Sequence, residues 1–181
     1  MRLKKHAYSL NGKISQGGRG ALLEDMINFT NEIYKRRGIA LVQKIPTPIT
    51  PIQMNGPIIT KAFFAEKSTV DYIGVADGRG ICFDAKECRQ KTFPLKNIHE
   101  HQYLFMNEFQ KNGGTTFMVL YYSTEEVFYL LTMEELRIFY QRMEDGGRKS
   151  ISFDELQEDH FFNTGETPVP YIEKIRSMKL G

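Results

Sequence analysis

Apolar residues recur first at helical and then at strand spacing along the chain, and this spacing divides it into alternating elements. Residues 20–37 are predicted to form an amphipathic helix that ends at Gly38, followed by a short strand at 39–44. The apolar stripe of this helix consists of Leu23, Met26, Ile27 and Tyr34. A second helix is predicted to begin at a cap residue, Asn97, and to run to about Asn112.

The second half of the chain continues the alternation. Two β-branched and aromatic runs, Thr115–Tyr122 and Val127–Leu131, are predicted to be strands. Thr132 and Glu135 have the spacing of a capping box, which predicts a third helix directly after them, and a short helix at about 170–178 follows. This order predicts an α/β fold with a mixed central β-sheet flanked by helices.

Two segments in the middle of the chain, 68–75 and 79–87, alternate in polarity and are joined by Asp77-Gly78, a turn pair typical of tight β-hairpins. The residues expected to be buried on one face of the second strand are Ile81, Phe83 and Ala85. The residues of its opposite face, which presents an acid and a base, are Cys82, Asp84 and Lys86.

Asp71 on the first of these strands, on the same face as Thr69, is expected to lie near Asp84 on the second, because adjacent strands approach to about 5 Å. Two carboxylates could then share one hard cation, which would polarise a phosphate and activate water. Lys86 is suited to stabilise charge that develops on phosphate oxygens. The pattern predicts a magnesium-dependent phosphodiesterase. The alternative is a surface hairpin whose polar face is merely solvated.

Prolines interrupt the chain before this hairpin. Pro46, Pro48 and Pro51 are too close together for a central strand, and a turn signal follows at Asn55-Gly56-Pro57. We therefore predict a protruding stalk or long hairpin at about 45–62, with an ordinary long surface loop as the alternative.

Gln102 is a polar residue in the apolar stripe of the second helix, and a buried amide needs hydrogen-bond partners. It either bonds to backbone in the core or points toward Asp71 and Asp84 as a ligand. His99 and His101, which flank it, are expected to be surface or supporting residues, because magnesium prefers oxygen.

Glu24 is the third acid of interest, near the start of the first helix. There it either complements the helix dipole or belongs to the acidic cluster.

Composition is that of a soluble globular protein of 181 residues, with 41% hydrophobic and 25% charged residues. The formal net charge is only +2, but no acid precedes Glu24, so residues 1–18 are predicted to be a flexible basic arm suited to phosphate. Cys82 and Cys88 are poorly spaced for a disulfide, which predicts reduced thiols and a cytoplasmic location. No apolar stretch approaches the roughly 20 residues of a membrane span.

These motifs together resemble the PD-(D/E)xK nuclease superfamily and, within it, the RecU-type Holliday junction resolvases. The resemblance covers about 17–155 in the family's order. Besides Glu24, the matching segments are Gly17-Gly18-Arg19-Gly20, Pro46-Thr47-Pro48, Ser68-Thr69-Val70-Asp71-Tyr72, Phe83-Asp84-Ala85-Lys86-Glu87, Lys91-Thr92-Phe93-Pro94-Leu95-Lys96-Asn97-Ile98-His99-Glu100-His101-Gln102 and Gly147-Arg148-Lys149-Ser150-Ile151.

The resemblance implies a restriction-endonuclease-like nuclease domain at 19–181 that carries the stalk as an insertion. It implies that Lys86 stabilises the transition state, that Glu24 completes the acidic cluster, and that Mg²⁺, or Mn²⁺ in its place, is bound. The residues that would hold the metal are Thr69, Asp71, Asp84 and Gln102. A homodimer would insert the stalk into a four-way DNA junction and resolve it by paired nicks during recombination and repair.

Three features depart from the family pattern. Asp84 replaces the usual glutamate, Val70 stands where the superfamily's name has proline, and the basic arm is short. The alternatives to a junction endonuclease are a nuclease-fold protein that mainly binds branched DNA or a recombinase partner, and a sequence-specific nuclease of the same superfamily. A partnership with a recombinase or branch-migration complex is left open by the sequence.

Overall fold

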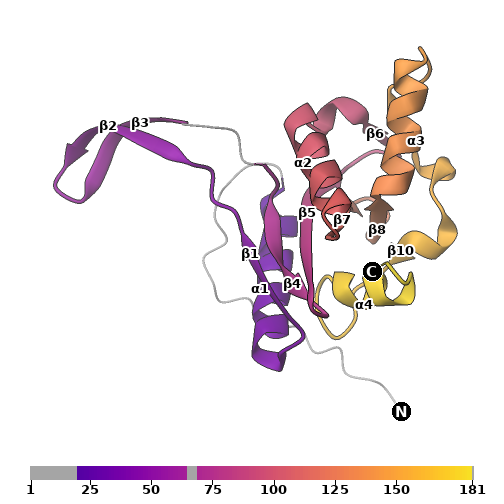
Figure 1. The fold of residues 1–181 in the computed structure, drawn as a ribbon, viewed down its shortest axis with the longest axis horizontal. Coiled ribbons are helices and arrows are strands. Elements are labelled where there is room, and N and C mark those ends of the chain that lie inside the picture. The colour runs from indigo at the N-terminus through magenta and orange to yellow at the C-terminus, as the bar shows by residue number, and fades with distance from the viewer. Residues whose placement is uncertain (1–19, 65–68, 181) are drawn as a thin grey trace.

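The structure, a computed structural model, describes residues 20–64 and 69–180, so the arm predicted at 1–18 lies outside the described residues. Six strands form the central sheet in the order β1-β4-β5-β7-β8-β10 (Figure 1). Their bounds are β1 Ala40–Lys44, β4 Tyr72–Ala76, β5 Arg79–Cys88, β7 Thr115–Tyr122, β8 Val127–Thr132 and β10 Phe161–Phe162. Because β5 and β7 are parallel while their neighbours pair antiparallel, the predicted mixed sheet is confirmed.

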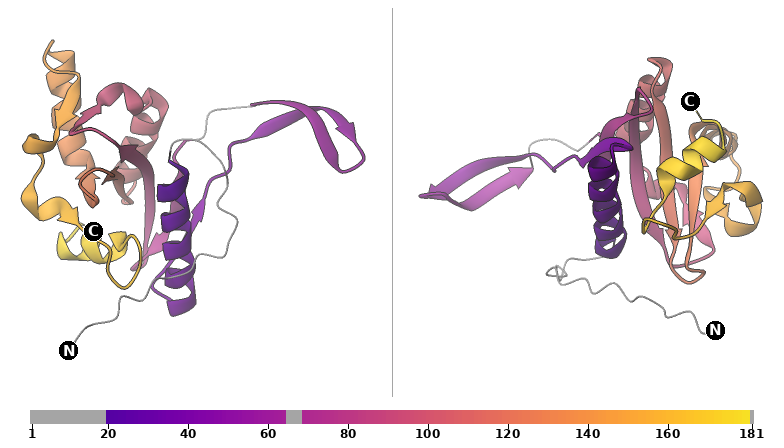
Figure 2. Two further views of the ribbon diagram at one scale, coloured as in Figure 1. Left: turned by 180° about the vertical axis from the view of Figure 1, so that it is seen from behind. Right: turned by 90° about the horizontal axis from the view of Figure 1, so that it is seen from below.

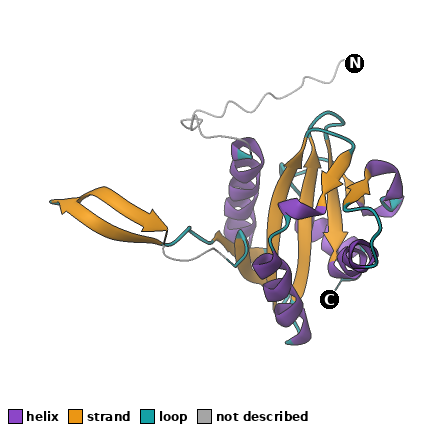
Figure 3. Cartoon of the chain, turned by 90° about the horizontal axis from the view of Figure 1, so that it is seen from above, coloured by secondary structure: helices purple, strands orange, loops and turns teal. Residues whose placement is uncertain are grey.

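Helices cover both faces of this sheet, so the domain has three layers (Figure 3). The helix α1 (Ala21–Arg37) and the short α4 (Tyr171–Ser177) pack on one face, and α2 (Glu100–Lys111) and α3 (Met133–Glu144) pack on the other. A buried apolar cluster lies between the sheet and the helices on each of its two faces. No helix in the described part of the chain is long and apolar enough to cross a membrane.

A column of aromatic rings holds the middle of the sheet in register. Tyr72 of β4 stacks on Phe83 of β5 at a ring distance of 4.8 Å, and Phe83 stacks on Phe117 of β7 at the same distance. Tyr171 of α4 packs against Phe83 from the helix side. These contacts fix β4 and β5 relative to one another on the face opposite α2, next to the expected site.

The predicted stalk is present as a two-stranded antiparallel hairpin formed by β2 (Ile49–Asn55) and β3 (Ile58–Phe64). It projects away from the three-layered body in every view (Figures 1 and 2). All residues of both strands are exposed. Pro51 is accommodated beside a register shift in this hairpin, as expected for a proline outside a central strand.

The second helix begins later than the sequence predicts. Asn97 belongs to a 3₁₀ turn, Leu95–Asn97, and His99 is the cap residue of α2. The reason is a hydrogen bond that the Gln102 side chain accepts from the His99 backbone N–H at 3.0 Å. This closes a capping box two residues beyond the predicted start.

Short elements were also missed because runs of two or three residues carry no periodicity. The strands β6 (Thr92–Pro94) and β9 (Ser150–Ser152) pair with each other outside the main sheet. Two further 3₁₀ turns, Phe153–Glu155 and Glu158–His160, lead into β10.

Gly74 is the point at which β1 can approach β4, and its substitution tests this packing. A Cβ there would lie 2.2 Å from the Leu41 carbonyl oxygen and 2.6 Å from Val42 Cα, both backbone atoms of β1. We expect Gly74→Ala to lower the free energy of unfolding by about 1–3 kcal/mol in urea denaturation. Gly80→Ala on β5 is the matched control, because its Cβ would meet only the Phe109 ring, at 3.1 Å. An equal loss in both variants would contradict this account.

Candidate metal and phosphate site

The hairpin turn between β4 and β5 determines which residues meet at the candidate site. Asp77 and Gly78 both have positive φ, at 51° and 76°, which is the backbone of a two-residue type I′ turn. The register that follows pairs Tyr72 with Phe83. Asp71 and Asp84, each one residue farther along, are therefore brought together as predicted.

Backbone hydrogen bonds hold the side chain of each aspartate against the chain segment that carries the other. The Asp71 backbone N–H donates to Asp84 Oδ1 at 2.7 Å, and the Ala85 backbone N–H donates to Asp71 Oδ2 at 3.2 Å. Each carboxylate thus accepts a backbone hydrogen bond from the strand that carries the other. The backbone pairing itself holds both side chains in place, which is a rigid arrangement for a ligand pair.

Lys86 completes this set from the same face of β5. Its Nζ lies 3.5 Å from Asp71 Oδ2 and 3.5 Å from Asp84 Oδ2. The lysine is partly exposed, so its ammonium group reaches both the carboxylates and the surface. One cation facing two anions leaves the cluster with a net negative charge when both acids are ionised.

Asp84 is buried, which excludes the alternative of a solvated surface hairpin. Its side chain is 0% exposed because α2 and α3 cover this face of the sheet, whereas the sequence pattern led us to expect burial of the opposite face alone. Cys82, two residues earlier on the same face, is also buried, and burial raises the pKa of its thiol to about 12. The acid therefore lies at the edge of an apolar layer.

This burial has an electrostatic consequence. Loss of hydration raises the pKa of Asp84 to about 6, opposed by the positive charge of Lys86 and reinforced by the negative charge of Asp71. Asp84 Oδ2 accepts no hydrogen bond from any described residue. A buried carboxylate oxygen without a hydrogen-bond donor is costly, and the Lys86 ammonium group at 3.5 Å, which also faces Asp71, offsets only part of that cost. This atom is therefore the clearest sign of a cation site.

Glu24 lies near but is engaged elsewhere. Its Oε2 accepts a hydrogen bond from Lys44 Nζ at 2.5 Å, and its backbone carbonyl is 3.5 Å from the Tyr72 hydroxyl. Within residues 20–64 and 69–180, no three His, Cys, Asp or Glu side chains gather as a metal site. The acidic pair is thus Asp71 and Asp84, and the role of Glu24 in the cluster stays a prediction.

The positions of the remaining predicted metal ligands do not by themselves indicate a metal site. Gln102 is buried on α2, on the face of the sheet that carries Asp84, and its Oε1 already accepts the capping bond from His99. Thr69 is exposed two residues before Asp71. His101 stacks on His99 at a ring distance of 5.3 Å. The metal-binding roles of Gln102 and Thr69 stay predictions.

Lys44 is the residue near this site that sequence reasoning did not identify. It ends β1 opposite Tyr72, and the next residue, Ile45, donates its backbone N–H to the Asp71 carbonyl at 2.8 Å. The whole stalk insertion lies between β1 and β4 in the sequence, although the two strands pair with each other. No local pattern in the sequence could therefore have indicated that Lys44 approaches Glu24.

The raised pKa of Asp84 predicts a pH-dependent change in stability on Asp84→Asn. Between about pH 4 and pH 6 the folded protein holds a proton that the unfolded chain releases, so the stabilisation from protonated Asp84 is lost as pH rises through 6. In EDTA, the variant should be more stable than wild type by up to about 3 kcal/mol at pH 8 and little changed at pH 4. Thermal unfolding at both pH values measures this, with the exposed Asp154→Asn as the control. A destabilised variant at pH 8 would contradict the burial cost.

Comparison with known proteins identifies the family. The family model described as Recombination protein U (RecU) matches residues 18–177. Proteins named Holliday junction resolvase RecU are similar over most of the chain. That of Geobacillus sp. is 39% identical, covering 90% of this chain and 85% of its own length. That of Lactococcus lactis subsp. lactis is 40% identical, covering 97% and 85%. That of Bacillus licheniformis is 41% identical, covering 95% and 90%.

Among solved structures, the Holliday junction resolvase Hjc of Archaeoglobus fulgidus aligns with a TM-score of 0.35 and 7% identity, over 61% of this chain and 74% of its own. That likeness is too low to carry an argument, whereas the family match spans nearly the whole chain. The chain therefore belongs to the RecU family.

Proposed function

We propose that the protein is a Holliday junction endonuclease that acts in homologous recombination and repair. The observation that carries this proposal is the joined pair of Asp71 and Asp84 with Lys86 beside both carboxylates. Membership of a family whose relatives are named Holliday junction resolvases supplies the substrate class. A protein that only bound branched DNA would have no need to bury a carboxylate beside a second one.

The donor set fits a divalent metal ion, and we propose Mg²⁺, with Mn²⁺ able to substitute. Mg²⁺ is commonly held by one or two protein carboxylates together with waters and substrate phosphates. Asp84 Oδ2, which has no donor among the described residues, and the Asp71 carboxylate would hold it, with Thr69 and Gln102 as the further ligands that the family resemblance implies. Such an ion polarises a scissile phosphate and lowers the pKa of a water molecule.

The chain's own residues have separable roles in this proposal. The backbone N–H groups of Asp71 and Ala85 keep both carboxylates oriented before any ligand binds. Lys86 favours the ionised form of Asp84, and its ammonium group can turn toward the negative charge that develops on phosphate oxygens. Asp84 must be deprotonated to bind a cation, so activity should decline below about pH 6.

The hairpin formed by β2 and β3 is suited to a branched substrate. It stands clear of the body (Figure 2), and large apolar side chains on it are exposed. The most exposed of these are Ile52, Met54, Ile58 and Phe64. An isolated two-stranded hairpin is marginally stable in water, so we propose that it is covered in use, at the centre of a junction and beside a second copy of the chain.

Further proposals follow from the same function. Paired nicks on opposed strands need two active sites, which a homodimer would supply. Both cysteines are free and buried, in keeping with reduced thiols in the cytoplasm. A recombinase or branch-migration complex is a candidate partner, since such proteins handle the same DNA.

Cleavage of a synthetic four-way junction tests the proposed activity. With Mg²⁺ we expect wild type to make paired symmetric nicks in the junction and to leave a linear duplex of the same sequence intact. Asp71→Asn and Asp84→Asn should each lower the cleavage rate at least about 100-fold, yet bind the junction in Ca²⁺ as wild type does. A variant in which a Gly-Gly link replaces residues 49–64 should lose selectivity for the junction while keeping its fold.

Unchanged cleavage by either aspartate variant would remove that residue from the site. Tight junction binding by wild type without cleavage in Mg²⁺ or Mn²⁺ would favour a DNA-binding protein instead. Cleavage of the linear duplex at a fixed sequence would favour a sequence-specific nuclease.

Glu24→Gln tests whether the third acid contributes to cation binding. In the proposed cluster, the Lys44–Glu24 ion pair opens when the metal binds, and Glu24 turns to the cation. This variant should then weaken the apparent Mg²⁺ affinity about threefold to tenfold in isothermal titration. Asp25→Asn is the matched control, because Asp25 is the exposed neighbour on the same helix. An Mg²⁺ affinity equal to that of wild type in both variants would exclude Glu24 from the cation site. Its role would then be limited to the start of the helix and the ion pair with Lys44.

A further inference from the structure

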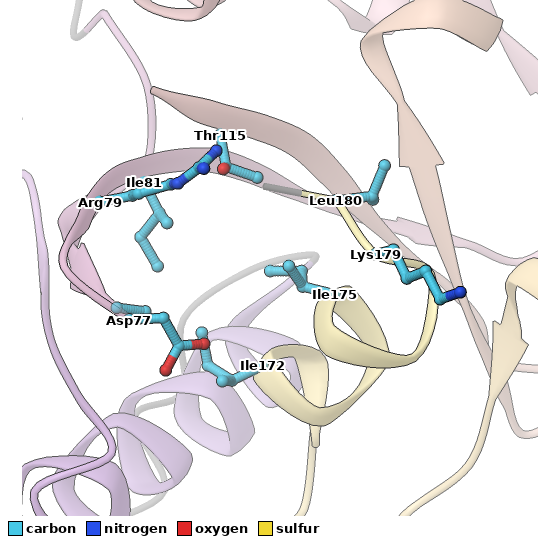
Figure 4. Close-up of a pocket in the computed structure, with 9 residues that line it drawn as sticks. Asp77, Arg79, Ile81, Thr115, Ile172, Ile175, Lys179 and Leu180 are labelled. Carbon is cyan, nitrogen blue, oxygen red and sulfur yellow. The ribbon is translucent and has the colours of Figure 1, made fainter. Parts of the chain in front are cut away.

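A small pocket lies at the end of the sheet opposite the acidic pair. It has a volume of about 270 Å³ and is formed where the start of β5 and the start of β7 meet α4 and the chain that follows it (Figure 4). Arg79, at the mouth, precedes Asp84 by five residues on β5, so the two lie about 17 Å apart along the strand. The pocket also faces the α1 and α4 side of the sheet, whereas Asp84 faces α2.

The interior of the pocket is apolar and built from well-packed residues. Ile81 of β5 and Ile172 and Ile175 of α4 converge in it (Figure 4). Their exposed fractions are 2%, 1% and 7%, so the floor is part of the core and is already formed without a ligand.

The mouth of the pocket carries positive charge. Arg79 and Lys179 line it from opposite sides (Figure 4). The Arg79 guanidinium and the Lys179 ammonium group have no hydrogen bond or ion pair with another described residue, although both residues are held by backbone hydrogen bonds. Asp77, the one acid among the described residues that line it, is neutralised by Arg176, which donates to its two carboxylate oxygens at 2.8 and 2.7 Å. The same guanidinium lowers the pKa of Asp77, so the acid stays ionised and paired.

These features favour one class of ligand. A volume of about 270 Å³ is below the ~300–1,000 Å³ of most cofactor and drug-like sites. It suits a single bulky apolar side chain, and two unpaired cations at the mouth suit carboxylates on the same ligand. DNA held at Asp71 and Asp84 would leave this end of the domain accessible.

We propose that this pocket is a docking site for an acidic segment of a partner protein, one apolar side chain of which enters between Ile81, Ile172 and Ile175. Aspartates or glutamates beside that side chain, or a terminal carboxylate, would pair with Arg79 and Lys179. The site would recruit the enzyme to a partner and is separate from the chemistry at Asp84.

The test uses the whole protein with ¹³C-labelled isoleucine δ1-methyl groups and a panel of fluorescein-labelled peptides. Each peptide has one Phe, Leu, Ile or Met flanked by aspartates, and two controls replace either the apolar residue or the aspartates by serine. We expect at least one acidic peptide to bind with a Kd below about 1 mM by anisotropy and to shift the methyl signals of Ile81, Ile172 and Ile175 but not those of Ile58 and Ile59 in β3.

Arg79→Gln and Lys179→Gln should each weaken the peptide about threefold to fivefold, while Lys149→Gln at the other end of the sheet should not. Binding and cleavage of the four-way junction should be unchanged in Arg79→Gln and Lys179→Gln. Failure of this proposal is therefore distinguishable from failure of the proposed nuclease function. The proposal is overturned if no peptide in the panel binds, or if the serine controls bind equally well. It is also overturned if the two pocket variants lose junction affinity, because the cations would then be DNA contacts.

Discussion

The pairing of β4 with β5 is the constraint on which the rest of the site depends. A two-residue turn at Asp77-Gly78 fixes the register, and the stacked rings of Tyr72 and Phe83 secure it on one face. On the other face, backbone N–H groups of the same two strands hold Asp71 and Asp84. The position of both carboxylates is therefore set by main-chain geometry and needs no ligand to form.

The burial of Asp84 lowers the stability of the metal-free protein but suits the proposed binding of a metal ion. A carboxylate that is removed from water, with one oxygen lacking a donor in the described chain, destabilises the metal-free protein once it is ionised. Lys86 offsets this cost only in part, because it lies 3.5 Å from that oxygen and also faces Asp71. The unbalanced charge is what a divalent ion would satisfy, so the feature that weakens the fold is the one that the proposed chemistry uses.

The separation of functions across the domain follows from the sheet. The C-terminal half of β5 carries the acid and the base, and the stalk leaves the body beside Asp71, through Ile45. The start of β5 instead meets α4 and forms the pocket with free cations at its mouth. A single strand thereby connects the end that we propose to act on DNA with the end that we propose to bind another protein.

Much of this arrangement could be predicted from the sequence, because the informative signals were local. The Asp77-Gly78 turn and the capping box at Thr132 each act over a few residues, and both are present. The alternation on β5 correctly placed Asp84 and Lys86 on one face, but Cys82 and Asp84 on that face are buried as well as Ile81 and Phe83 on the other. The burial of Asp84 could not be predicted, since it depends on helices that come later in the chain. Lys44 was missed because β1 reaches β4 only after the stalk has returned. The start of α2 was misplaced because Gln102, singled out for its chemistry, also serves as a cap.

A crystal structure of the protein with Mn²⁺, with data collected above the manganese absorption edge, tests the central claim most directly. The account predicts an anomalous peak between the carboxylates of Asp71 and Asp84, bonded to Asp84 Oδ2. A peak elsewhere on the protein, with Asp84 Oδ2 still facing only the Lys86 ammonium group, would contradict it.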